Sequence, residues 1–451
     1  MMQEFLNAAS RYVSTDVEAR YLEGARYEPG QSPAILRPST SEDVIQLLRL
    51  ASQCDVRLVV QGAHTSLVEA ATPRGEIVLS TERLRHVFQV EELDKTLRVS
   101  AGFRLSEINA RLERDDLVFP IDLGADPSVG GMLAHNTGGA RMLRYGDVRA
   151  NVLALDVVLA SGRQLRLGRG LCKDNSQLHF QGLFVGSSGG LGVITEATLK
   201  LHARPKQRTV ALVAVASLEN VWPLYRKWSR TFGDLISAFE GISANALGAA
   251  LRCSRTASPF AEIPEYSLLV ELSTAMPAKC VDARAVLHAE LEAALDSGEL
   301  TDAVVNNDDA LWALRHSISE GLRAFGPVIG FDISLPRANL WDFRSRVSSW
   351  LSADYPDAIV CDFGHLGDGG QHFNLVWPSD AVRLAGAEIE VLKGRFYALL
   401  AEFGGCFSAE HGLGPRVQDA YDRYTPTEVR EVTRQVVRSL GAEERLGRFR
   451  F

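Results

Sequence analysis

The chain has 451 residues, which is too long for one ordinary hydrophobic core, so two or three domains are expected. Hydrophobic residues make up 46% of the chain and charged residues 23%, a composition typical of a globular protein in water. The 48 Lys and Arg stand against 56 Asp and Glu, giving a formal net charge of -8, which excludes nucleic acid and anionic membrane surfaces as expected partners.

The cysteine pattern and the N-terminal sequence indicate the cellular compartment of the protein. The six cysteines are scattered without a Cys-x-x-Cys pair, which argues against a disulfide framework or an iron–sulfur cluster and for a reducing environment. Residues 1–20 predict an amphipathic helix without the basic start and long apolar run of a signal peptide. No segment approaches the roughly 18 consecutive apolar residues of a spanning helix. We therefore expect a cytoplasmic protein with no membrane span.

The first part of the chain alternates short strands and helices. A strand at residue 35 is followed by a helix capped by Ser39 or Ser41, with an apolar stripe at helical spacing. Further periodic runs follow it. They predict strands at residues 56–60, 77–80, 87–91, 96–99, 152–160 and 197–201 and a helix at 106–112. This mixture predicts an α+β domain.

Three polar or glycine-rich stretches in this part suit a dinucleotide. The loop at residues 61–67 follows a strand, and its small residues and the hydroxyls of Thr65 and Ser66 suit a backbone cradle for phosphate. The strict Gly-x-Gly-x-x-Gly of nicotinamide-binding folds is absent, so the loop alone is weak evidence. Residues 120–141 and 186–195 expose many backbone donors, which a dinucleotide could receive. The alternative is a glycine-rich α+β domain without a cofactor.

The second part begins after Arg204-Pro205, which ends a strand. Strands at residues 209–216, 268–272 and 331–335 alternate with helices at 221–232, 282–295 and 340–352. This alternation predicts an open antiparallel sheet with helices on one face. Two more helical patterns, at residues 385–403 and 427–440, are expected to return to the first domain.

Two stretches near the C-terminus carry candidate chemistry. Residues 360–377 predict a hairpin around a glycine-rich turn, which would bring His365 and His372 side by side. Two imidazoles can hold zinc or iron but need a third ligand, for which Glu410 is a candidate, with His411 beside it as a base. The alternative is that the histidines bond to backbone and that Glu410 and His411 cap a helix.

These two stretches resemble the signatures of the FAD-linked D-2-hydroxy acid dehydrogenases, which include D-lactate, D-2-hydroxyglutarate and glycolate dehydrogenases. Residues 364–369 (Gly-His-Leu-Gly-Asp-Gly) and 408–414 (Ser-Ala-Glu-His-Gly-Leu-Gly) carry the resemblance. It implies a divalent metal, zinc first with iron or manganese as alternatives. It also implies site residues in three roles: His365, His372 and Glu410 as metal ligands, His411 as the catalytic base, and Asn374 close to the substrate.

The resemblance extends over residues 33–205, where it implies an FAD site. Serine, proline and glycine residues replace some usual family residues near 126–128 and 188–190, and His64 stands where the family usually has a third glycine. Whether FAD is covalently attached through His64 stays open; an ordinary polar neighbour of the cofactor is the preferred interpretation. The implied FAD contacts are Gln61, Gly62, Ala63, His64, Thr65, Ser66, Leu67, Asp122, Ser128, Gly131, His135, Asn136, Gly138, Gly139, Gly192, Val193 and Ile194.

Residues 311–320 resemble the family's substrate-contact helix. In the D-2-hydroxyglutarate branch, an arginine, a hydroxyl residue four positions on and a later lysine bind the distal carboxylate. Arg315 matches the first and Ser319 the second, one helical turn on. Gly330 replaces the lysine and Phe331 places an apolar ring next to it. A shorter or less charged hydroxy acid than a five-carbon diacid is therefore expected.

The fold implied by the resemblance is α+β, of the vanillyl-alcohol-oxidase type. Its parts are a PCMH-type FAD-binding domain at residues 1–205 and an antiparallel-sheet substrate domain at 206–384. A C-terminal helical segment at 385–451 returns to the FAD-binding domain and completes the active site.

The implied function is flavin-dependent oxidation of a D-2-hydroxy acid to the 2-keto acid. The metal would chelate the substrate, His411 would take the hydroxyl proton, and hydride would pass to N5 of FAD. Because the chain lacks a clustered-cysteine extension, electrons are expected to leave to an external electron-transfer flavoprotein, quinone or cytochrome. Two alternatives stay open, a metal-independent oxidase that uses O2 and a non-catalytic FAD-binding subunit. The exact hydroxy acid, the metal and homodimer formation also stay open.

Overall fold

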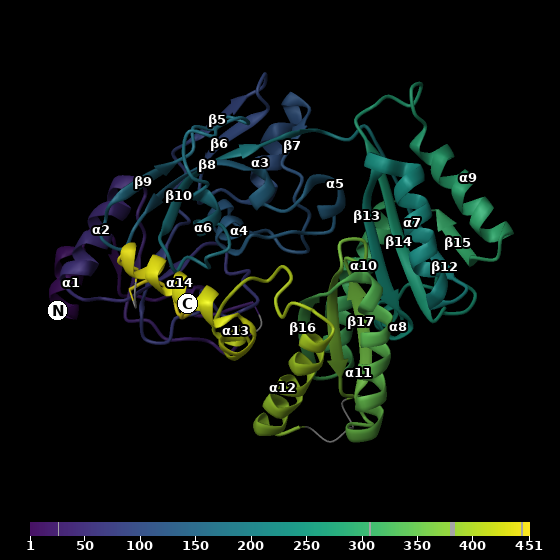
Figure 1. Cartoon of the computed structure of the whole chain (residues 1–451). Helices are drawn as coiled ribbons and strands as arrows, with labels where there is room; N and C mark the ends of the chain where they lie inside the picture. Colours follow the sequence, from purple (N-terminus) through teal and green to yellow (C-terminus); the bar gives the residue numbers. More distant parts are fainter. Residues whose placement is uncertain (26, 306–307, 379–383, 443–444) are drawn as a thin grey trace. The chain divides into compact units, whose positions relative to one another are not determined.

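The computed structural model describes residues 1–25, 27–305, 308–378, 384–442 and 445–451, and it divides into two compact units (Figure 1). Unit 1 combines residues 1–139, 146–204 and 410–451. Unit 2 combines residues 140–145 and 205–409. No helix in the part of the chain that the structure describes is long and apolar enough to cross a membrane.

Unit 1 holds two main sheets, and the second is antiparallel throughout. The first has the order β1 (Val13–Ser14), β2 (Ile35–Leu36), β4 (Ile77–Ser80), β3 (Leu58–Gln61), with β4 parallel to both of its neighbours. The second has the order β5 (Phe88–Glu91), β6 (Thr96–Ser100), β10 (Val193–Lys200), β8 (Val152–Val158), β9 (Gln164–Leu167). A short pair joins β7 (Leu117–Val118) and β11 (His202–Ala203).

The helices of unit 1 come from both ends of the chain. They are α1 (Met2–Ala8), α2 (Ser41–Gln53), α3 (Leu105–Leu112), α4 (Val129–His135), α6 (Gln181–Phe184), α13 (Gln418–Tyr424) and α14 (Thr427–Ser439). The predicted N-terminal helix is confirmed only for its first part, because α1 ends at Ala8.

Helix α2 confirms the predicted apolar stripe but not the predicted N-cap. Its predicted apolar stripe is confirmed, since Val44, Leu47 and Leu48 are buried in the core of unit 1. The predicted cap is wrong: Thr40, between the two serines we named, caps the helix. Its side chain accepts from Asp43 N, and the Asp43 carboxylate accepts in turn from the backbone of Thr40. The Thr-x-x-Asp spacing makes this reciprocal box possible.

Unit 2 is built on one antiparallel sheet of seven strands among the described residues. The order is β15 (Leu300–Val305), β12 (Gln207–Val215), β14 (Tyr266–Thr274), β13 (Ile236–Ser243), β17 (Ile359–Gly364), β18 (Gly370–Val376), β16 (Val328–Ser334). Its helices are α5 (Met142–Tyr145), α7 (Val221–Phe232), α8 (Ala244–Ser254), α9 (Ala283–Asp296), α10 (Asp308–Phe325), α11 (Leu340–Asp354) and α12 (Gly386–Glu402).

Helices cover both faces of this sheet, so the predicted single helical face is wrong. Val270 of β14 lies in the core that also contains residues of α7, α9, α11 and α12. Its neighbour Leu269 lies in a second core with residues of α8 and α10. Strands covered on both faces show no alternation of buried and exposed residues, and all nine residues of β14 are buried.

The two C-terminal helices that we expected to return together separate instead. Leu392, Phe396 and Leu400 place α12 in the core of unit 2, where Phe396 stacks on Phe331 with ring centroids 3.7 Å apart. Helices α13 and α14, drawn in yellow in Figure 1, belong to unit 1. The apolar side chains of α12 find their partners on the sheet nearest in sequence.

Candidate functional site

A loop at the end of β3 is the first candidate cofactor region. Gln61 is 1% exposed, and its Nε2 donates to Tyr21 O and Ala71 O at 2.7 Å each. Its backbone carbonyl accepts from Thr81 N at 2.9 Å. Gln61 therefore anchors the loop that follows it rather than presenting its own side chain to solvent.

Two backbone segments approach each other closely at Gly62. A Cβ on Gly62 would lie 2.2 Å from Ser128 Oγ, which no real side chain tolerates. Ser128 is the N-cap of α4, and its Oγ accepts from Gly131 N at 3.2 Å. The predicted residues Gly62, Ser128 and Gly131 thus form one cluster, and glycine is required by space at Gly62.

The loop at residues 62–67 presents backbone donors. Among the described residues, none accepts a hydrogen bond from the N–H groups of this loop. His64 adopts φ of +60°, a left-handed conformation that glycine takes at no cost, which explains why glycine is the usual family residue there. Its Nδ1 is buried and has no hydrogen-bond partner in the described part of the chain, and burial lowers the pKa of His64. The ring is therefore neutral near pH 7.

A second tight backbone approach follows α4. Asn136 ends the helix at φ of 52°, and its side chain bridges Asp147 Oδ2 and Arg149 N at 2.8 and 2.9 Å. Gly139 has φ of +92°, and a Cβ there would lie 2.3 Å from Asp122 O. These contacts fix Asn136 at the end of α4 and place Gly139 against the backbone of Asp122, all within unit 1.

The start of β10 offers backbone only. A Cβ on Gly192 would lie 2.7 Å from Val157 Cγ1, and the side chains of Val193 and Ile194 are buried in the cores of unit 1. Any contact of these three residues with a cofactor must therefore come from main-chain atoms. The remaining predicted contacts belong to the loops already described: Ala63, Thr65, Ser66, Leu67 and Gly138.

These features of unit 1 fit FAD. The donors of residues 62–67 suit a pyrophosphate, which backbone N–H groups bind readily. Two buried ring nitrogens, His64 Nδ1 and His135 Nδ1, have no hydrogen-bond partner among the residues that the structure describes, as expected for groups beside a polar ligand. Gly62 lets the first loop approach Ser128, and Gly139 lets the segment after α4 approach Asp122.

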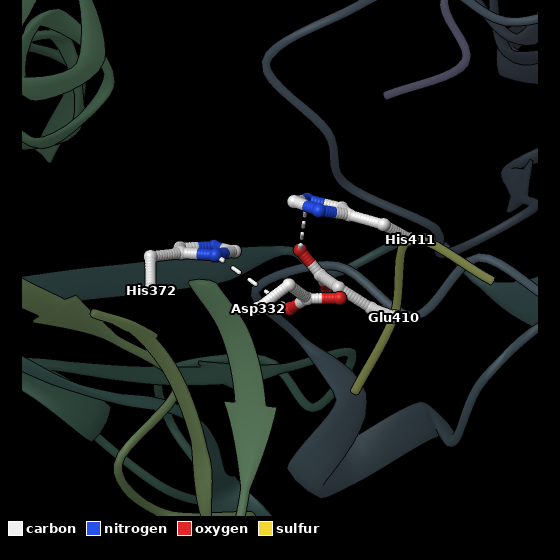
Figure 2. Close-up of side chains that lie close together, drawn as sticks. All are labelled: Asp332, His372, Glu410 and His411. Atoms are coloured by element: carbon white, nitrogen blue, oxygen red, sulfur yellow. Dashed lines mark ion pairs between the residues drawn. The ribbon is translucent and has the colours of Figure 1, made fainter. Parts of the chain in front are cut away.

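The predicted base and carboxylate ligand lie next to α4 within unit 1. Gly139 N donates to Glu410 Oε2 at 3.4 Å, and Ser188 Oγ donates to Leu413 O at 2.5 Å. His411 Nε2 lies 4.0 Å from Glu410 Oε1, the pair joined by a dashed line in Figure 2. Burial lowers the pKa of the neighbouring His135 to about 4, so its ring is neutral at neutral pH. The segment at 410–413 is thus fixed against the predicted FAD residues.

The predicted hairpin is confirmed in unit 2. Strands β17 and β18 pair antiparallel, and the rings of His365 and His372 have centroids 5.2 Å apart. His372 lies opposite Asp332 in the register of β18 and β16. His372 Nδ1 is 3.8 Å from Asp332 Oδ1, and Figure 2 shows the ring directed toward this carboxylate.

A buried carboxylate on β13 organises the other predicted residues of unit 2. Glu240 is 0% exposed; its Oε1 lies 2.8 Å from His365 Nδ1, and its Oε2 accepts from Arg315 Nε at 2.7 Å. Burial acts to raise the pKa of Glu240, but the charge of Arg315, followed by the interaction with His365, outweighs burial and holds the pKa at about 2. Glu240 is therefore ionised throughout the physiological range.

Arg315 is only 8% exposed, and its guanidinium lies over the Phe363 ring at 4.6 Å. Its charge is already paired with Glu240, a partner that the sequence did not suggest. Ser319 lies one turn further along α10 and is partly buried. The proposed substrate role of both residues stays a prediction.

Asn374 and Gly330 face each other across β18 and β16. Asn374 Nδ2 donates to His372 O at 3.1 Å, and a Cβ on Gly330 would lie 2.9 Å from Asn374 Oδ1. The expectation that Phe331 borders this position is wrong. Successive strand residues point to opposite faces, and Phe331 packs against Phe396 in the core.

The end of unit 2 contacts the strand that carries Asp332. Ala409 N donates to Asp332 O at 3.3 Å within unit 2, and Glu410 is the next residue in the chain. The side chains that could hold a metal are Asp332 and His372 in unit 2 and Glu410 and His411 in unit 1, all of types that bind divalent ions.

The sequence reasoning missed the roles of Glu240 and Asp332. Each is a carboxylate within an otherwise apolar strand, in Phe239-Glu240-Gly241 and Phe331-Asp332-Ile333. Burying a charge without a partner costs several kcal/mol, so an acid in such a strand signals a paired or ligand-binding group. That signal was present in the sequence but names no partner.

Comparison with known proteins places the chain in a family. The FAD binding domain family matches residues 32–168, and the family of FAD linked oxidases, C-terminal domain, matches residues 204–441. The mitochondrial D-2-hydroxyglutarate dehydrogenase of Bos taurus is 34% identical over 429 residues, covering 93% of this chain and 77% of that protein. The D-2-hydroxyglutarate dehydrogenase of Xanthomonas citri pv. viticola is 34% identical over 390 residues, covering 84% and 81%.

A solved structure of alkyldihydroxyacetonephosphate synthase shares the fold. It aligns with a TM-score of 0.74 at 17% identity, covering 98% of this chain and 84% of that chain. The α+β architecture with a PCMH-type FAD-binding domain is therefore confirmed. Fold, matched families and relatives agree that this chain is a flavin-dependent oxidoreductase belonging to the FAD-linked D-2-hydroxy acid dehydrogenase family.

Proposed function

We propose that this protein oxidises a D-2-hydroxy acid to the corresponding 2-keto acid and passes the electrons to an external acceptor. The observation that carries the proposal is the set of imidazoles and carboxylates on two motifs, His372 with Asp332 and Glu410 with His411. The hydrogen bond from Ala409 to Asp332 supports it, because it ties the start of the second motif to the strand that carries the first.

His411 is proposed to accept the proton of the substrate hydroxyl on an imidazole nitrogen. An imidazole suits this step because its ordinary pKa lies near neutrality. The hydrogen bond from Gly139 to Glu410 supports the role, since it restrains the residue adjacent to the base. FAD, when bound, supplies the acceptor for the hydride that leaves C2 of the substrate.

His372, Glu410 and His365 are proposed to hold a divalent metal, with Asp332 as a further candidate ligand. Nitrogen and carboxylate oxygen ligands of this kind suit zinc, with iron or manganese as alternatives. Such an ion, when bound, polarises the substrate hydroxyl and fixes its orientation. The carboxylates also suit an ion because they add negative charge beside the imidazoles.

The substrate is proposed to be a hydroxy acid with a short or weakly charged side chain. The curated relatives are named for D-2-hydroxyglutarate, a diacid. In this chain Gly330 replaces the lysine expected at the distal end, and the charge of Arg315 is paired with Glu240. Because Arg315 is the one cation left of that pair and its charge is already paired, we expect D-lactate, D-2-hydroxybutyrate or D-malate to be preferred over the five-carbon diacid.

Dye-coupled turnover would test this proposal. The FAD-loaded protein is incubated with each D- and L-2-hydroxy acid and an artificial electron acceptor, and the product is trapped as the hydrazone of its keto group. We expect a 2-keto acid from one D-acid and little peroxide in air. A product other than the keto acid, or peroxide in stoichiometric amount without dye, would refute the dehydrogenase assignment.

A further inference from the structure

Glu240 stands between two predicted functional residues and belongs to neither motif. One oxygen, Oε1, lies 2.8 Å from His365 Nδ1. The other, Oε2, accepts from Arg315 at 2.7 Å from Nε and 2.6 Å from Nη2. All three residues lie in unit 2, and Glu240 is fully buried on β13.

This geometry dictates which nitrogen of His365 carries a proton. The adjacent Arg315 supplies the positive charge that keeps a buried carboxylate ionised. An ionised carboxylate can only accept hydrogen bonds, so His365 Nδ1 must be the donor. In a neutral ring, Nε2 then keeps its lone pair for another partner.

We propose that Glu240 is a positioning residue of the metal site, fixing the tautomer and the orientation of His365 so that Nε2 is available as a ligand. Histidine ligands of metals commonly donate their second nitrogen to a carboxylate, which also raises the basicity of the ligating nitrogen. The inference rests on the proposed metal site. It assigns Arg315 a second role, as the counter-charge that holds Glu240 in place.

The neighbouring strand provides a matched control. Glu271 of β14 is also 0% exposed and also pairs with an arginine, Arg141, at 2.8 Å. Its other partners are Trp312 Nε1 at 2.8 Å, Ser237 Oγ at 2.7 Å and Arg208 Nε at 3.9 Å. None of these partners is a predicted metal ligand, so Glu271→Gln removes a comparable buried charge without changing a group bonded to His365.

The test measures Co²⁺ affinity of metal-free protein by the ligand-field absorption of the bound ion. Glu240→Gln should raise the Co²⁺ dissociation constant by roughly 10- to 100-fold and alter the band shape. Glu271→Gln should leave both unchanged, and thermal unfolding would show that both variants are folded. Equal loss in both variants, or no loss in Glu240→Gln, would overturn the inference.

A double-mutant cycle separates positioning from general structure. If Glu240 acts through His365, Glu240→Gln should add no further loss of Co²⁺ affinity in a His365→Asn background. If the double variant instead loses Co²⁺ affinity by the product of the two single losses, Glu240 does not act through His365. This comparison uses metal affinity alone and needs no turnover.

The wild-type protein gives an independent reading if Glu240→Gln does not fold. With ¹⁵N-labelled histidine, long-range proton–nitrogen correlation spectra report the protonation of each ring nitrogen, and His365→Asn assigns the signal. Nδ1 should carry the proton in the metal-free protein, and Nε2 should shift when Co²⁺ is added. Protonation at Nε2 alone or at both nitrogens would contradict the inference, as would wild-type protein that binds no Co²⁺. If Co²⁺ binding behaves as expected but no hydroxy acid is oxidised, only the proposed function is refuted and the inference about Glu240 stands.

Discussion

The FAD-binding region of unit 1 depends on close backbone packing, whereas the hairpin region of unit 2 depends on interactions between polar side chains. Around Gly62 and Gly139, backbone segments approach so closely that a Cβ would collide with Ser128 or Asp122. Around Glu240 a carboxylate, a guanidinium and an imidazole are packed at hydrogen-bond distance inside a sheet-and-helix core. The first region depends on the absence of side chains, and the second depends on charge.

Burial favours the neutral form of a titratable group in both regions, but the outcomes differ. In unit 1 burial lowers the pKa of His135 to about 4, so the ring stays neutral. In unit 2 burial would raise the pKa of Glu240, but paired charges hold it at about 2, so the carboxylate stays ionised. A change of volume should disrupt the first region, and a change of charge the second.

The largest effect is expected from His411→Asn. Removing the proposed base should lower kcat by about 10²- to 10⁴-fold, because no other group would take the hydroxyl proton in the transition state. Dye-coupled turnover measures this loss, and absorbance of released flavin should show normal FAD content. His288→Asn, an exposed histidine on α9, is the control. Unchanged turnover in His411→Asn would remove the base assignment.

A smaller effect is expected for His135 in acid. The unfolded chain protonates this ring near its ordinary pKa of 6.5, whereas the folded protein does so only near 4. Between pH 6.5 and 4 the unfolded state therefore binds more protons than the folded state. The contribution of neutral His135 to the free energy of unfolding is fully present above pH 6.5 and falls, by up to roughly 3 kcal/mol, as the pH drops toward 4. Urea unfolding at several pH values should show a flatter profile for His135→Gln. If the free energy of unfolding of His135→Gln depends on pH as steeply as that of the wild type, the His135 ring is not held neutral by burial.

The smallest effect is expected from Gly62→Ala. The added Cβ would meet Ser128 Oγ, and overpacking of this kind costs about 1–3 kcal/mol, so FAD affinity should fall by roughly 5- to 150-fold. Fluorescence titration of apoprotein with FAD measures the change. Gly124→Ala is the matched control, because no atom lies within 4 Å of a Cβ built there. Equal affinities in the two variants would show that this approach does not shape the FAD site.

Local pattern was enough to predict many elements. The strand at Ile77–Ser80 and the helix at Val221–Phe232 have the predicted bounds, because apolar spacing and flanking polar residues define them. The hairpin that brings His365 and His372 together was predictable for the same reason, since turn and strands are adjacent in sequence. The exact cap of α2 was not, because three neighbouring hydroxyl residues compete for it.

Long-range pairing was not predictable. Glu240 and Arg315 are 75 residues apart, and β13, which carries Glu240, has no alternating pattern because it is buried on both faces. Nothing in the spacing of Arg315 indicates that a carboxylate from a distant strand takes its charge. The roles of the individual site residues, the electron acceptor, a homodimer and a cytoplasmic location stay predictions.

Anaerobic flavin reduction tests the central claim most directly. The FAD-loaded protein is mixed with D- and L-lactate, D-malate, D-2-hydroxyglutarate, glycolate and D-2-hydroxybutyrate, each before and after removal of metal by a chelator, and flavin absorbance is followed. The account predicts rapid bleaching by one D-acid, lost on chelation and restored by added Zn²⁺. No bleaching by any acid with FAD and metal both bound, or bleaching indifferent to chelation, would contradict it.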